Sequence, residues 1–268
     1  MIKKYLPLIA GILTTVLLSS CSEYQKVLKE DDMKQKYDMA EKLYNEGDHR
    51  KALRLFDQIV PNYIGKPQGE RLIYFYADSY YQVGQYYQSS YQFERFSKSY
   101  PKSEKAEEAS FLGAKSKFLT APKYSLDQEL TREALTGLQA FINSYPQSQH
   151  QEEANAMVQE LRNKLDKKAF EIAKQYNTIS DYFGSIKAFE LFLKDHPGSA
   201  YREDALFNKY LAEYNLASNS ILSKREERYN NAVATYETLI KDYPEGSYRE
   251  EADKMLADIQ SELEQFSK

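Results

Sequence analysis

Residues 86–109 read YYQSSYQFERFSKSYPKSEKAEEA, and this stretch decides the fold. Four residues ahead of its proline are separated by steps of three, four and three: Tyr86, Ser89, Phe93 and Phe96. Such steps place side chains on one face of a helix. Pro101 cannot continue that helix, and the acidic pair before Ala109 suits the early turns of another. The stretch therefore predicts two helices joined by a short turn. A serine in the turn can cap the second helix.

The same pattern recurs along the chain. Its turns are Tyr100–Ser103, Tyr145–Ser148, His196–Ser199 and Tyr243–Ser247. The matching helix faces are Thr131, Ala134, Leu138, Phe141; Tyr182, Ser185, Phe189, Phe192; and Tyr229, Ala232, Tyr236, Leu239. A fifth copy lies upstream at His49, Ala52, Phe56 and Ile59. Since Phe56, Phe93, Phe189 and Tyr236 hold equivalent positions between helices, we expect all four to be buried.

Composition agrees with a helical protein. Gly (10) and Pro (8) are scarce, 42% of residues are apolar and 28% are charged, which excludes a disordered chain. A net charge of −4 argues against a nucleic-acid partner. Gly47 and Gly84 end matching helices 37 residues apart, close to the tetratricopeptide (TPR) period of about 34. We therefore expect an all-α TPR solenoid over residues 33–268, with about five helix pairs. A longer helix should run from Gln151 to Gln175, and a capping helix from Tyr248 to Phe266.

The N-terminus has the layout of a lipoprotein signal peptide over residues 1–20. Two lysines precede the apolar stretch Leu6–Leu18, which is shorter than the ~20 residues that a membrane-spanning helix needs. It ends in Leu18-Ser19-Ser20-Cys21, which resembles a bacterial lipobox. We expect Cys21, the only cysteine, to carry covalent lipid, followed by a linker over residues 21–32. The alternative is an ordinary signal peptide with an incidental cysteine.

The lipobox, the TPR units with Tyr-Pro-x-Ser junctions and the insertion Pro122–Gln128 together resemble the BamD family, in its Bacteroidetes-like form. This resemblance implies an outer-membrane lipoprotein that faces the periplasm and serves as a scaffold of the β-barrel assembly (BAM) machinery. Its implied partners are the POTRA domains of BamA and unfolded outer-membrane β-barrel proteins, received through an aromatic-ending C-terminal β-signal. Ala188 aligns with an arginine that contacts BamA in some members, so that contact does not transfer.

The sequence is also compatible with functions of other classes. A lipid-anchored TPR adaptor of another envelope machine (cell-wall, pilus or motility) stays open, because the TPR fold serves many partners. A glycan-binding lipoprotein is disfavoured by the absence of Trp. The motifs of nucleotide, metalloprotease and serine hydrolase sites are missing from the sequence, so we expect neither an enzyme nor a cofactor.

A substrate groove is expected on the first helices of the first two units. Counting from Gly47 and Gly84, four positions in each point away from the core pattern: Lys34, Tyr37, Glu41, Tyr44, and Arg71, Tyr74, Asp78, Tyr81. Two aromatic residues and one cationic residue recur at equivalent positions of the two helices. This combination suits an extended peptide with aromatic side chains and a free carboxylate. The alternative is that these tyrosines fill packing gaps.

Overall fold

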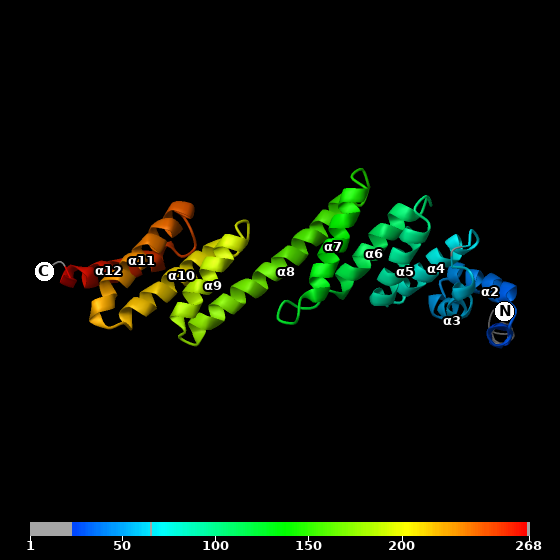
Figure 1. Ribbon diagram of the computed structural model, residues 1–268, viewed down its shortest axis with the longest axis horizontal. Helices are drawn as coiled ribbons and strands as arrows, with labels where there is room; N and C mark the ends of the chain where they lie inside the picture. The colour runs from blue at the N-terminus through cyan, green and yellow to red at the C-terminus, as the bar shows by residue number, and fades with distance from the viewer. Residues whose placement is uncertain (1–22, 65, 267–268) are drawn as a thin grey trace, which may run out of the picture. The chain divides into compact units, whose positions relative to one another are not determined.

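The computed structural model describes residues 23–64 and 66–266. Over these residues the secondary structure is helical and contains no strand (Figure 1). The elements in chain order are α2 (Met33–Asn45), α3 (His49–Ile59), the 3-10 helix η2 (Val60–Asn62), α4 (Gly69–Gln82), α5 (Tyr86–Ser99), α6 (Ala106–Thr120), α7 (Glu129–Ser144), α8 (Gln151–Thr178), α9 (Tyr182–Asp195), α10 (Arg202–Ser218), α11 (Leu222–Asp242), α12 (Arg249–Leu263) and η3 (Glu264–Phe266).

Neighbouring helices pack in antiparallel succession, as in a TPR array. α2 packs on α3, α4 on α5, α6 on α7 and α10 on α11. With α8 followed by α9, this makes five pairs, and α12 follows as the expected cap. The prediction of an all-α TPR solenoid is confirmed.

The chain divides into two compact units, where the sequence indicated one domain. The first contains the described residues up to Ala121 together with Glu129–Val158, and the second contains Pro122–Gln128 and Gln159–Lys268. The boundary falls within α8, which ends at Thr178 rather than at Gln175. The insertion belongs to the second unit, because Lys168 of α8 donates to the Leu126 carbonyl at 2.6 Å and Lys167 lies 4.6 Å from the centre of the Tyr124 ring.

The repeated helix faces form the cores of both units. Phe56, Phe93 and Phe189 are completely buried, as expected. Tyr236 is only half-buried, because its hydroxyl reaches the surface and donates to Asp253 at 2.6 Å. That part of the expectation was wrong, since tyrosine keeps its polar end at a partner when its ring packs.

The small residue of the repeat carries a repeated hydrogen bond. The Ser89 hydroxyl donates to the Ala77 carbonyl at 3.2 Å, and the Ser185 hydroxyl donates to the Ala173 carbonyl at 3.1 Å. Both serines are fully buried. The bond satisfies a polar group that close helix packing removes from water.

The turn inside three of the pairs needs a left-handed residue. Gly47 (φ 81°) and Gly84 (φ 77°) supply it, as the sequence suggested, and Ser180 (φ 63°) supplies it in a later pair. Asp48 and Asp181 then cap the following helices through the backbone N–H groups of Lys51 and Gly184. The junction serines act differently from our expectation. They accept bonds inside the turn, as Ser103 does from the Lys105 N–H at 3.0 Å, rather than capping the next helix.

The described N-terminal residues are more ordered than a linker. Residues 23–29 are helical, and Tyr24 and Val27 are buried in the core of the first unit. The linker that we expected over residues 21–32 is therefore largely a docked helix. The signal peptide and Cys21 lie outside the described residues.

Candidate peptide-binding site

A hollow of about 570 Å³ lies over α4 on the first unit. Its lining residues come from α2, from α4 and its preceding turn, from α5, and from the junction before α6: Tyr37, Pro67, Gln68, Glu70, Arg71, Tyr74, Phe75, Phe96 and Lys105. Tyr37, Arg71 and Tyr74 are three of the eight residues that the sequence indicated. The hollow combines aromatic rings with two cationic side chains.

We expected Tyr74 and Asp78 to point away from the core, but both side chains are buried. Tyr74 is only 7% exposed, and its ring meets Phe93 and Phe96 edge-on at 5.7 and 5.5 Å between centroids. Asp78 is 8% exposed. Rings of α5 cover Tyr74, and the Tyr44 hydroxyl of α2 reaches Asp78, so neither position on α4 is as free as helix periodicity alone suggests.

Asp78 anchors a small polar network between α2 and α4. It accepts hydrogen bonds from the Tyr44 hydroxyl at 2.7 Å and from the Gln82 amide at 3.1 Å. The Tyr44 ring stacks on Phe75 with centroids 4.0 Å apart. Burial, reinforced by the bond to Asp78, raises the pKa of the Tyr44 phenol above its ordinary value. Tyr44 is therefore held in place beside Phe75 and Asp78, and it does not line the hollow.

Each cation in the region has a carboxylate partner. Arg71 pairs with Glu41 and covers the Phe75 ring at 5.0 Å, although its own side chain is 60% exposed. Lys105 pairs with Glu108 at 2.7 Å and lies 5.3 Å from the centre of the Tyr74 ring. Lys34 pairs with Asp38 at 3.0 Å and does not line the hollow. Exposed pairs of this kind contribute about 0–1 kcal/mol, so a ligand carboxylate can share their donors at small cost.

The remaining expected residues lie at the edge of the hollow or outside it. Tyr81 is half-buried against Tyr86, with centroids 5.6 Å apart. Sequence reasoning missed Phe75, Phe96 and Lys105. Phe96 had been assigned to the core, and Lys105 follows the proline turn, so neither shares the period that defined the groove.

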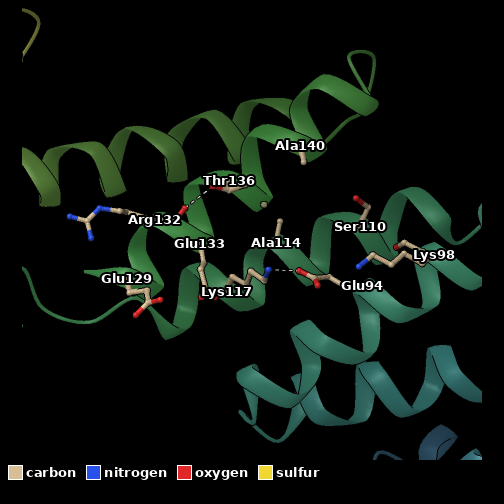
Figure 2. A pocket seen from close by; sticks show the side chains of 12 residues that line it. Glu94, Lys98, Ser110, Ala114, Lys117, Glu129, Arg132, Glu133, Thr136 and Ala140 are labelled. Carbon is tan, nitrogen blue, oxygen red and sulfur yellow. Dashed lines mark hydrogen bonds and ion pairs between the residues drawn. The ribbon is translucent and has the colours of Figure 1, made fainter. Parts of the chain in front are cut away.

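A second hollow of the first unit shows mixed charge rather than a catalytic arrangement. It measures about 560 Å³ and lies among α5, α6 and α7, where Lys117 reaches across to Glu94 (Figure 2). Ser110, Ala114 and Ala140 are small residues on its walls.

The histidines have structural contacts. His150 stacks on Phe111 at 4.1 Å, and His196 stacks on Phe192 while its Nδ1 lies 2.8 Å from Asp166. Across residues 23–64 and 66–266, no group of three or more His, Cys, Asp or Glu side chains could hold a metal ion. Within the same residues, no helix has both the length and the apolar character that a membrane crossing requires.

The paired helices, their turns and the cap define the class: this is a TPR solenoid protein. Residues 219–246 match a tetratricopeptide repeat family directly. The chain belongs to the YfiO family, described as outer membrane lipoprotein, which it matches over residues 29–228. This family is not an enzyme class.

Two individual proteins show similarity. The outer membrane protein assembly factor BamD of Caulobacter vibrioides (strain ATCC 19089 / CIP 103742 / CB 15) is 22% identical over 229 residues, which are 84% of this chain and 73% of that protein. The crystal structure of MamA protein aligns with 79% of this chain and 92% of its own, at 15% identity and a TM-score of 0.32.

Proposed function

We propose that this protein is a lipid-anchored scaffold of the β-barrel assembly machinery, held on the periplasmic face of the outer membrane. The observation that carries the proposal is the family match over residues 29–228, joined by the similarity to an outer membrane protein assembly factor. A lipobox that ends at Cys21 agrees with it. The proposed partners are the POTRA domains of BamA and unfolded outer-membrane β-barrel proteins.

The hollow over α4 supports the second of these partners. Rings of Tyr37, Tyr74 and Phe75 offer apolar and edge-to-face contacts to an aromatic side chain. Arg71 has a planar guanidinium with five donors, of which Glu41 occupies only some. An extended peptide that ends in an aromatic residue and a free carboxylate matches this combination.

The partner assignment is tested by isolating the intact lipoprotein from membranes and identifying what is bound. Recovery of BamA supports the proposal. Recovery of cell-wall, pilus or motility proteins without BamA would contradict it and favour the alternative, an adaptor of another envelope machine.

The peptide site is tested with one peptide in two forms, ending in a free carboxylate or in an amide. Arg71→Gln should weaken binding of the carboxylate form by about tenfold and leave the amide form unchanged, because the lost contact is a charge-assisted pair. The effect should be larger at low salt, since the pair is exposed. Lys34→Gln, which removes an equal charge outside the hollow, is the matched control.

The anchor is tested by Cys21→Ser. The variant should lose lipid labelling and either stay unprocessed or leave the outer-membrane fraction, because two or three acyl chains hold a protein on a membrane almost permanently. A mature, lipid-labelled Cys21→Ser chain in that fraction would overturn the anchor.

A further inference from the structure

A third hollow in the first unit lies next to the docked N-terminal helix and is lined by two arginines. It measures about 350 Å³ and is lined by Arg50, Leu53, Arg54, Asp57, Tyr80, Val83 and Gln85. Arg50 and Arg54 stand one turn apart on α3, and both are exposed. Neither forms an ion pair with a carboxylate among the described residues.

Neighbouring acidic groups are already engaged. Asp57 accepts hydrogen bonds from the Tyr76 hydroxyl at 2.6 Å and the Tyr80 hydroxyl at 3.0 Å. Asp48 pairs with Lys51 at 2.6 Å. Arg50 and Arg54 thus line a hollow that contains one carboxylate, and that carboxylate is bound by two phenols. Paired guanidinium groups of this kind suit a phosphate.

Arg54 also connects this hollow to the chain that leads to the membrane. Tyr24 is 4% exposed, and Lys51 lies 5.8 Å from the centre of its ring. Burial raises the pKa of the Tyr24 phenol, and the positive charges of Arg54 and Lys51 oppose that rise, which places both cations beside it. The helix at residues 23–29 is therefore docked directly against α3.

The short length of chain between Cys21 and Tyr24 limits how far the docked helix can be from a lipid on Cys21. Tyr24 follows Cys21 by three residues, and three residues of extended chain span at most about 11 Å. If Cys21 carries the acyl chains, Tyr24 and the adjoining end of α3 are held at the lipid headgroups. This step rests on the proposed anchor.

We infer that the hollow lined by Arg50 and Arg54 binds the phosphate of a lipid headgroup in the leaflet that carries the anchor. The site adds a second attachment beside the acyl chains. It fixes the first TPR pair at the membrane surface instead of leaving it on a tether.

The test measures partition of the mature chain from residue 21 carrying Cys21→Ser, whose binding is dominated neither by acyl chains nor by the apolar stretch Leu6–Leu18. The probes are vesicles of phosphatidylethanolamine with or without phosphatidylglycerol. Each arginine near an anionic surface contributes about fivefold in partition, so Arg50→Gln with Arg54→Gln should lower binding to the anionic vesicles roughly 25-fold. The matched control is Lys194→Gln with Lys241→Gln, which removes equal charge from exposed sites on α9 and α11 and should change partition less than about twofold.

Three results would overturn the inference. The parent chain does not bind the anionic vesicles, or the two double variants lose binding equally, or the arginine variant loses binding of inorganic phosphate alone while vesicle partition is unchanged. The last result would assign the hollow to free phosphate. Failure of the proposed anchor would be recognised separately, because the native chain would then carry no lipid label. Failure of the proposed function would be recognised by the absence of BamA from the proteins isolated with the chain.

Discussion

Ser180 occupies a backbone conformation that the two matching turns give to glycine. Its φ of 63° falls in the left-handed region, where a side chain meets the backbone, and Gly47 and Gly84 avoid that cost. The Asp181 cap that follows holds the turn in place. Ser180 is therefore a strained position that the surrounding pair stabilises.

Ser180→Gly should raise the free energy of unfolding by about 0.5–1 kcal/mol, because relief of the strain exceeds the added freedom of the unfolded chain. Urea denaturation measures it. Gly84→Ala is the reciprocal control and should destabilise the protein by a similar amount. A Ser180→Gly chain less stable than the parent would contradict the role assigned to this turn.

Residue periodicity predicted the core well and the candidate site only in part. Phe56, Phe93 and Phe189 follow from helix spacing, because core positions repeat with the helix. Tyr74 does not, since its environment depends on rings of α5 that lie about 20 residues further along the chain. Lys105 enters the hollow from a junction that has no helical period. Contacts between elements, not spacing within one, define this surface.

At the scale of single elements, α10 carries a buried ion pair. Lys209 donates to Glu213 at 2.7 Å and to the Thr235 hydroxyl at 2.8 Å, and the Glu213 side chain is 7% exposed. Burial raises the pKa of Glu213 above its ordinary value of 4.5, and Lys209 only partly opposes this. The charged carboxylate is thus costlier in the folded protein than in the unfolded chain.

A raised glutamate pKa implies that stability is highest below the unfolded value and falls as pH rises through the folded value. Glu213→Gln does not titrate, so the variant should gain stability relative to the parent as the pH rises from about 4 to about 7. Urea titrations across that range measure the trend. Glu250→Gln is the control with the opposite sign, because Lys254 lowers the pKa of Glu250. Parallel pH curves for parent and Glu213→Gln would exclude the assigned burial effect.

The element boundaries illustrate a further limit of sequence reasoning. The long helix was expected to end at Gln175, and α8 continues to Thr178, where the left-handed Ser180 and the Asp181 cap end the turn. In the first two pairs a glycine occupies the left-handed position that ends the first helix. Because Ser180 occupies it here, the sequence alone did not indicate where α8 ends. Helix existence follows from the apolar period, whereas helix ends depend on one residue's backbone angle.

At the scale of the molecule, the two compact units predict uneven loss of structure. Phe93 is completely buried in the first unit, and truncation of a buried Phe typically costs 3–5 kcal/mol. Since TPR pairs contact chiefly their neighbours, Phe93→Ala should cause loosening centred on residues 70–100 while amides of α10 and α11 keep their protection. Hydrogen exchange measures both regions in one sample.

Phe189→Ala is the matched variant in the second unit and should show the reverse pattern. Equal loss of protection along the whole chain in either variant would mean that the two units unfold as one.

Two equivalent hydrogen bonds indicate where whole helix pairs can be removed from the chain. They run from the Ser89 hydroxyl to the Ala77 carbonyl and from the Ser185 hydroxyl to the Ala173 carbonyl. Each bond spans twelve residues and closes the same kind of helix pair, and the two donors are 96 residues apart. Deletion of residues 90–185 therefore joins the first turn of α5, which ends at Ser89, to the rest of α9 in unchanged register. We expect this shortened chain to be helical and to melt cooperatively, as circular dichroism would show. A gene that gains or loses such blocks by recombination keeps a foldable product, so the number of pairs is free to vary while the ends keep their separate tasks.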